Sequence, residues 1–346
     1  MSDSDVGERA IRKPGSVRRQ AINVSKEELV SAGPLAEGQT LPLLIRSAVA
    51  DLNLSAWAQD NRERIEGHLR EHGAVLFRGF SMRPVDEFEQ FIRAIAGEPL
   101  EYRERSSPRT RIAGNIYTST EYPADQSILL HNENSYQHTF PLRLCFHCVT
   151  PASEGGETPI ADCRRVFQRL STDLRERFER KQVMYVRNFG DGFGLSWQMV
   201  FQTEDRDEVE QFCHRARVEC EWKKGDRLRT RQVRPAIAVH PRTSEKVWFN
   251  HVAFFHFTSL ESSVSAALLA VFGEENLPNN TYFGDGSSIE TSDLEEIRAA
   301  YAAETIRFPW QRGDVLLVDN MLVAHGRAPY AGERKILIGM AEPIHW

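Results

Sequence analysis

Three side chains in this sequence are of the types that together hold a catalytic metal. His131 and Glu133 stand two residues apart at the end of a β-favouring run, so on a strand both point to the same face. His325 follows a second apolar run near the C-terminus. Two histidines and one carboxylate form the facial triad that binds non-haem Fe(II) and leaves coordination positions open. The alternatives are a surface turn for the first pair and a structural core histidine for His325.

An arginine follows the second histidine at the start of the next predicted strand. Arg334 presents a planar fork of donors, which binds a carboxylate through two hydrogen bonds better than lysine does. It could anchor the far carboxylate of a dicarboxylate cosubstrate that chelates the iron. The alternative is a surface ion pair with Glu333.

The elements that must position these residues are mostly strands, with helices inserted between them. Apolar periodicity predicts helices at 57–72, 84–96, 163–181 (one or two), 205–216, 262–272 and 292–303. A capping box, Ser292 with Glu295, is expected to begin the last of these helices. Short β-favouring runs predict strands at 74–77, 116–120, 128–130, 142–149, 233–240, 246–250, 314–319 and 335–341. There is no steady β-α alternation and no internal repeat, which favours an α+β protein with an antiparallel core.

Composition excludes several classes of protein. The 346 residues include 43 Lys and Arg against 49 Asp and Glu, and this net charge of −6 disfavours a nucleic-acid-binding protein. No apolar run approaches the ~20 residues needed to cross a bilayer. Five cysteines and no apolar signal segment favour a reducing, cytoplasmic location. We expect a mobile tail at 1–25 and a single domain at 26–346.

Six segments taken together resemble one enzyme family, the TauD/TfdA Fe(II)/2-oxoglutarate-dependent dioxygenases. Within it they resemble the clavaminate-synthase-like and syringomycin-type amino-acid hydroxylase branch. The segments are 72–80, 117–120, 131–136, 155–159, 248–250 and 319–327. The resemblance extends from about residue 72 to residue 343. It implies a double-stranded β-helix (jelly-roll) core with flanking helices and an insert at about 163–300 between jelly-roll strands.

The resemblance also implies roles for individual residues. His131, Glu133 and His325 match the iron ligands and are therefore the catalytic centre, and Arg334 and Thr158 match the residues that hold 2-oxoglutarate. The expected reaction consumes 2-oxoglutarate and O₂, releases succinate and CO₂, and hydroxylates an unactivated C–H bond. The expected substrate is an amino acid or amino-acid-derived metabolite of secondary metabolism. Desaturation, epoxidation and cyclisation remain open as alternative outcomes.

Family position also suggests substrate-binding residues and limits the substrate. The candidates for the pocket are Asn115, Tyr117, Ser135 and Asn250. Related halogenases carry a small residue where this chain has Glu133, so we expect oxygenation and not chlorination. Taurine-oxidising relatives carry a second arginine where this chain has Ile338, so a sulfonate substrate is disfavoured.

Two features of the insert suggest further contacts. The glycines and aromatic residues at 192–198 are typical either of a lid over the iron or of a buried loop anchor. A basic run follows Trp222 and is expected to be either a solvated face or a docking surface for an acidic carrier protein that delivers a tethered substrate. Its members are Lys223, Lys224, Arg227, Arg229, Arg231 and Arg234.

Alternatives from other classes are an O₂-independent metal isomerase on a jelly roll and a non-catalytic jelly-roll binding protein. Neither explains the triad together with Arg334 and Thr158. We expect a small-molecule substrate, no membrane partner, and leave open whether the chain forms a homo-oligomer.

Overall fold

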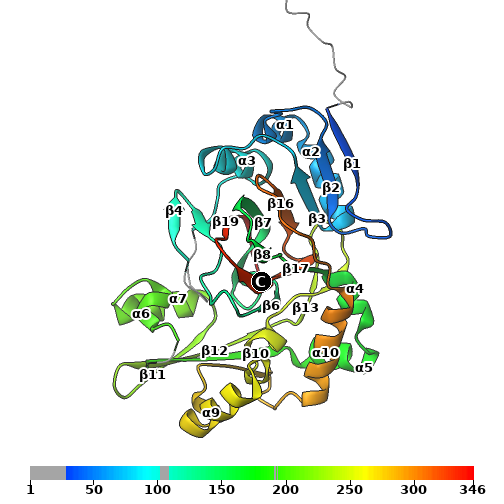
Figure 1. Ribbon diagram of the computed structural model, residues 1–346. Helices are drawn as coiled ribbons and strands as arrows, with labels where there is room; N and C mark the ends of the chain where they lie inside the picture. The colour runs from blue at the N-terminus through cyan, green and yellow to red at the C-terminus, as the bar shows by residue number, and fades with distance from the viewer. Residues whose placement is uncertain (1–28, 102–108, 191, 193) are drawn as a thin grey trace, which may run out of the picture.

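The computed structural model describes residues 29–101, 109–190, 192 and 194–346 (Figure 1). The tail expected at 1–25 lies outside the described residues. In the described part, no helix is both long and apolar enough to cross a membrane.

The larger sheet has eight strands in the order β1-β2-β3-β16-β7-β19-β5-β4. Their bounds are Val30–Pro34, Leu43–Ser47, Ala74–Arg78, Val315–Asp319, Thr139–Thr150, Lys335–His345, Ile116–Thr118 and Arg111–Ala113, in the same order. All neighbours are antiparallel except β2 and β3. Every residue of β3 and β16 is buried, because both strands lie inside the sheet and both of its faces are covered.

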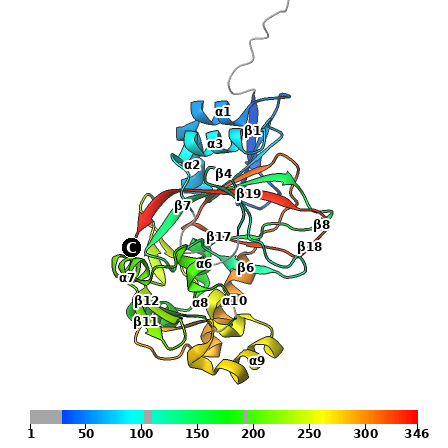
Figure 2. The ribbon, with the colours of Figure 1, turned by 90° about the vertical axis from the view of Figure 1, so that its left-hand side faces the viewer.

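Three helices cover the outer face of this sheet, at the top of Figures 1 and 2. They are α1 (Leu54–Asp60), α2 (Arg62–His72) and α3 (Asp86–Ala96). The apolar side of α3 packs on the sheet through Phe88, Phe91 and Ile92, as its sequence spacing predicts. The helix predicted at 57–72 is in fact two helices, because the chain departs from helical geometry at Asn61 (φ −117°, ψ 20°).

A smaller sheet faces the other side of the large one and completes the jelly roll. It consists of β6 (Ile128–His131), β17 (Val323–Arg327) and β9 (Ile160–Asp162), in that order. Between the two sheets lies an apolar core that includes Leu144, Phe146, Leu316, Val323 and Ile336. Two-stranded pairs extend the framework: β8 (Glu154–Gly155) with β18 (Tyr330–Ala331), and β13 (Ile237–Val239) with β14 (Lys246–Trp248).

The chain between β9 and β16 forms a third layer, in the lower half of Figures 1 and 2. Its sheet has the order β11-β12-β10-β15, with bounds Glu219–Lys223, Arg227–Arg234, Val183–Phe189 and Asn279–Phe283. Its α-helices are α4 (Cys163–Arg169), α5 (Thr172–Lys181), α6 (Trp197–Phe201), α7 (Arg206–Arg215), α8 (Val252–Phe255), α9 (Ser262–Phe272) and α10 (Thr291–Glu304). Two short 3-10 helices flank α9: η1 (Phe257–Ser259) precedes it and η2 (Glu274–Asn276) follows it.

Two local predictions for this layer are wrong in detail. Helix α10 begins at Thr291 after an N-cap at Glu290 that makes no side-chain cap, so the predicted capping box at Ser292 does not form. The strand predicted at 233–240 is divided, because β12 ends at Arg234 and β13 begins only at Ile237. Pro235 lies between them and cannot donate a backbone hydrogen bond to a sheet.

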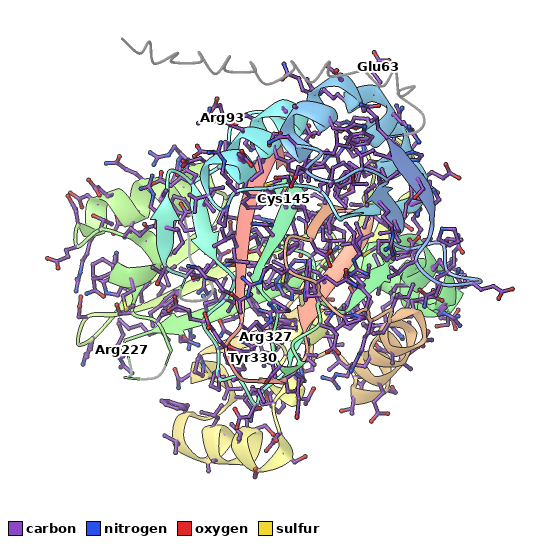
Figure 3. All side chains as sticks on the ribbon, turned by 45° about the horizontal axis from the view of Figure 1, so that its top comes forward. Glu63, Arg93, Cys145, Arg227, Arg327 and Tyr330 are labelled. Carbon is purple, nitrogen blue, oxygen red and sulfur yellow. The ribbon has the colours of Figure 1, made fainter. Side chains whose placement is uncertain are left out.

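Side-chain packing follows this layering (Figure 3). Cys145 lies in the interior on β7, whereas Glu63, Arg93 and Arg227 lie at the periphery. Burial raises the pKa of the Cys148 and Cys163 thiols to about 12, so both cysteines stay protonated and act as small apolar side chains.

Candidate metal centre and cosubstrate site

Adjacent strands of the smaller sheet bring the two triad histidines face to face. The antiparallel register pairs His131 of β6 directly with His325 of β17, and the ring centroids lie 4.5 Å apart. Glu133 follows just beyond β6, with its Oε2 4.0 Å from His131 Nε2 and 3.8 Å from His325 Nε2. One ligand atom from each residue lies within 4.8 Å of the others, so the three residues could hold a single ion.

The imidazoles are in the protonation state that a metal requires. Burial lowers the pKa of His131 and lowers that of His325 well below its ordinary value, so both rings are neutral at pH 7. His131 Nδ1 lies 2.8 Å from the Leu129 carbonyl oxygen, which can only accept. Nδ1 therefore carries the proton, and the lone pair of Nε2 is left for the metal.

Glu133 is held by its backbone and by its carboxylate. The Asn320 side chain accepts from the Glu133 backbone N–H (2.8 Å) and donates to the Glu133 carbonyl oxygen (2.9 Å). Arg109 donates from Nη2 to Glu133 Oε2 at 2.8 Å, and each side chain is only 3% exposed. Sequence reasoning did not single out Arg109, because it is one of several arginines in a polar stretch and nothing in its spacing sets it apart from Arg111.

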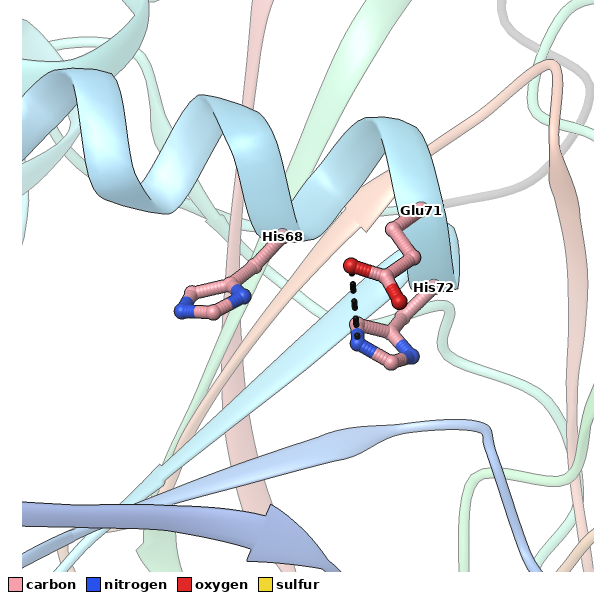
Figure 4. A group of neighbouring side chains, drawn as sticks. All are labelled: His68, Glu71 and His72. Atoms are coloured by element: carbon pink, nitrogen blue, oxygen red, sulfur yellow. Dashed lines mark ion pairs between the residues drawn. The ribbon is translucent and has the colours of Figure 1, made fainter.

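A second group of possible ligands lies on the surface of α2 (Figure 4). His68, Glu71 and His72 also bring ligand atoms within 4.8 Å, because residues three and four apart on a helix are neighbours. However, the Glu71 side chain is 73% exposed, and His72 Nδ1 is already 2.9 Å from the Thr40 carbonyl oxygen. We assign no metal to this group.

A small cavity of about 30 Å³ adjoins the triad. Arg109, Thr158 and Arg334 line it together with His131 and His325, so the two residues expected to hold 2-oxoglutarate open onto the space beside the metal ligands. A guanidinium and a hydroxyl therefore line the space beside the three candidate metal ligands.

Hydrogen bonds to neighbouring residues hold the side chains of Arg334 and Thr158 in place. Arg334 donates from Nε to the Gly156 carbonyl oxygen (2.9 Å) and from Nη1 to Ser119 Oγ (3.2 Å). Burial lowers the pKa of Arg334 to about 10, which still leaves it cationic at pH 7. Thr158 Oγ1 accepts from Trp310 Nε1 at 3.1 Å, so the hydroxyl proton remains available to a carboxylate. Sequence reasoning did not identify Trp310.

The four residues suggested for the substrate do not line this small cavity. Asn115 donates to a backbone carbonyl in the loop before β4, and Tyr117 is buried in the apolar core. Ser135 Oγ lies 2.6 Å from His251 Nδ1. Asn250 is hydrogen-bonded to two backbone groups, and it also lines a larger recess between β6, α8 and α10. Each therefore has a structural contact.

The basic run does not form one continuous surface. Arg229 and Arg234 are buried at 7% and 4% exposure and donate to backbone carbonyl oxygens. Arg231 lies 3.3 Å from Glu221 across the strand pair. The expectation of a solvated face therefore fails for two of the six residues. The loop at 192–198 falls partly outside the described residues, since residue 193 is not described.

Comparison with known proteins decides the family. The model of the family described as "Taurine catabolism dioxygenase TauD, TfdA family" matches residues 35–341. The chain belongs to the TauD/TfdA family. It is 41% identical over 312 residues to the dapdiamide synthesis protein DdaC of Enterobacter agglomerans, covering 90% of this chain and 94% of that protein. It is 32% identical over 289 residues to a clavaminate synthase-like protein of Arabidopsis thaliana, covering 80% and 84%.

Solved structures of TauD/TfdA-like fold agree with this assignment. PvcB of Pseudomonas aeruginosa superposes with a TM-score of 0.55 at 16% identity, covering 91% of both chains. Another PvcB structure, described as an Fe, alpha-ketoglutarate dependent oxygenase, gives 0.53 at 16% identity over 93% of this chain and 94% of that one. AAD-2 with Mn(II) and N-oxalylglycine gives 0.53 at 12% identity over 90% and 96%. The jelly-roll core is thus the fold of the family.

As a TauD/TfdA dioxygenase, the protein uses Fe(II), 2-oxoglutarate and O₂. The triad fits Fe(II), because it offers two neutral imidazoles and one carboxylate in a buried pocket. When bound, Fe(II) with 2-oxoglutarate supplies the activation of O₂ that an unactivated C–H bond requires. Hydrogen bonds from this chain's own residues fix the orientation of His131 and the backbone of Glu133 beside that position.

Proposed function

We propose that the protein hydroxylates an unactivated C–H bond of an amino acid or amino-acid-derived metabolite in secondary metabolism. His131, Glu133 and His325 hold Fe(II) in this proposal, and Arg334 with Thr158 holds 2-oxoglutarate. The observation that carries it is the convergence of three ligand atoms within 4.8 Å beside a cavity lined by Arg334 and Thr158. The similarity to a protein of dapdiamide synthesis supports a biosynthetic substrate.

The carboxylate of Glu133 occupies the third protein position of the triad, so the proposed outcome is oxygenation and not chlorination. Desaturation, epoxidation and cyclisation use the same residues and differ only in the fate of the substrate. Mass analysis of the product separates most of these outcomes, since hydroxylation adds one oxygen whereas desaturation and ring closure remove two hydrogens.

The decisive experiment is an anaerobic titration of the purified protein with Fe(II) and 2-oxoglutarate. We expect a weak visible metal-to-ligand band with one equivalent of iron, and succinate after O₂ is admitted. His131→Ala should abolish both readouts. His68→Ala is the matched control, because it removes a histidine from the surface group on α2 and should leave both unchanged. An intact band in His131→Ala would contradict the assignment.

A further inference from the structure

A recess of about 290 Å³ lies next to the metal centre, between β6 and helices α8 and α10. Its lining includes Leu129, Leu130, Phe254, Arg298, Arg307 and Arg327. Ile128 and Arg327 line both this recess and the small cavity beside the triad. The Phe254 ring centroid lies 4.8 Å from that of His131. The recess therefore shares a wall with the metal centre.

The charge of the recess has one sign. Its lining includes three arginines and no Asp or Glu. In the described part of the chain, no carboxylate lies within 4.0 Å of Arg298, Arg307 or Arg327. Most of the remaining wall is apolar, with Leu129, Leu130 and Phe254.

The three arginines differ in exposure and in the hydrogen bonds that their guanidinium groups already make. The Arg327 guanidinium already donates hydrogen bonds to the carbonyl oxygens of Tyr122, Pro123 and Gln126. Arg307 is exposed to solvent. Arg298 is half-buried and donates from Nη2 to Thr258 Oγ1 at 2.7 Å. A partly desolvated guanidinium gains most from an anion, and a carboxylate matches its planar donors.

We propose that this recess takes the substrate and that Arg298 binds a free carboxylate of it, while the apolar wall holds the rest of the molecule beside the metal. The inference rests on the proposed function and narrows its substrate class. A volume of about 290 Å³ is at the small end of ligand pockets, which suits an amino acid or a short acyl derivative. A carboxyl group bound in this way is not esterified to a carrier protein. Burial of Arg229 and Arg234 in the basic run agrees with a free substrate.

The test measures binding next to the metal without requiring turnover. The protein is loaded with Mn(II) and N-oxalylglycine, so that Arg334 is occupied. Hexanoate, phenylpropanoate and N-acetyl-L-leucine are then titrated against their primary amides and their methyl thioesters. Mn(II)-induced broadening of ligand proton resonances reports both the affinity and the proximity to the metal.

We expect at least one acid to bind about tenfold tighter than its amide and thioester, with its protons broadened by Mn(II), because a charge-assisted bidentate contact is lost in the neutral forms. Arg298→Gln should remove this preference. Arg180→Gln, which deletes an exposed arginine elsewhere, should keep it. Equal binding of acids and neutral forms across the panel, a preference that survives in Arg298→Gln, or acid binding without broadening would each overturn the proposal.

Failure of this inference is distinguishable from failure of the proposed function. The visible band of Fe(II) with 2-oxoglutarate depends on the triad and Arg334 and should be the same in Arg298→Gln as in the unmodified protein. If that band is absent from both proteins, the function itself is wrong. If it is present in both while the acid preference is absent, only the assignment of the recess is wrong.

Discussion

The Asn320 side chain forms two hydrogen bonds with the backbone of Glu133: it accepts from the Glu133 N–H and donates to the Glu133 carbonyl oxygen. Asn320 stands in the turn that leads from β16 into β17, the strand of His325. In the same turn, the backbone carbonyl oxygen of Asn320 accepts a hydrogen bond from Asn132 Nδ2 at 2.6 Å. One short turn thus sets the position of Glu133 relative to His325.

Replacing Asn320 should therefore weaken metal binding without removing a ligand. In Asn320→Ala, the Glu133 backbone loses both partners, and we expect Mn(II) affinity to fall by about 10–100-fold. Isothermal titration measures this directly. Asn188→Ala is the matched control, because Asn188 also donates to two backbone carbonyl oxygens but lies in the insert. Unchanged affinity in Asn320→Ala would show that the turn does not position Glu133.

Arg109→Met should lower stability in a way that metal can restore. Breaking a buried ion pair leaves the Glu133 carboxylate uncompensated, at a cost of about 3 kcal/mol. Mn(II) supplies a new cation at that carboxylate, so the metal-induced rise in Tm should be larger in Arg109→Met than in the unmodified protein. In the control Arg78→Met, which breaks the buried pair with Asp314, Mn(II) should give only the ordinary rise. Equal rises in both variants would contradict this account.

Trp310→Phe should weaken 2-oxoglutarate binding and leave metal binding intact. The loss of the indole N–H removes the hydrogen bond that orients the Thr158 hydroxyl, which is worth about 1 kcal/mol and hence about fivefold in KM for 2-oxoglutarate. Trp248→Phe is the control, because the buried Trp248 indole N–H has no partner in the structure. An unchanged KM in Trp310→Phe would show that Thr158 is oriented by something else.

The pH dependence of stability should report on Asp319. Burial alone would raise the pKa of Asp319, but the Arg143 guanidinium and the His240 hydrogen bond together hold it below its ordinary value. A lowered folded pKa gives stability that is complete above the unfolded pKa of about 3.9 and is lost as pH falls through the folded pKa. Asp319→Asn keeps an acceptor for the Met321 and Leu322 N–H groups but removes the charge.

Urea denaturation of Asp319→Asn should therefore give a clearly lower free energy of unfolding at pH 7, by about 3 kcal/mol. The difference from the unmodified protein should shrink as the pH is lowered below 4. A constant difference at all pH values would mean that the charge is not responsible. Asp125→Asn, on an exposed loop, should show no difference.

Sequence patterns predicted local elements well wherever burial is periodic. Helix 262–272 was predicted with its observed bounds, and the apolar side of α3 packs as expected. Predictions failed where the backbone conformation of one or two residues decides where a helix begins or ends. Asn61 interrupts a helix that its neighbours favour, and Ser292 lies one residue inside a helix that begins without a side-chain cap.

The metal triad could be proposed from sequence because its residue types carry the chemistry themselves. The sequence could not single out the residues that support the site, because only folding brings them to it. Folding places Arg109 beside Glu133, Trp310 beside Thr158, and Arg298 in the recess. Likewise, the sequence spacing of the basic run says nothing of burial, which is why Arg229 and Arg234 could not be separated from their neighbours.

The contact between Glu133 and Asn320 spans 187 residues of chain. During synthesis the N-terminal part of the jelly roll therefore emerges with His131 and Glu133 long before the turn and β17 exist. Contacts between residues so far apart in the sequence form late, and they lower the folding rate because the entropy of closing a long loop must be overcome first. If His131, Glu133 and His325 hold iron as proposed, the growing chain carries an incomplete site until β17 has been made, and all three ligands can bind the metal only after that point.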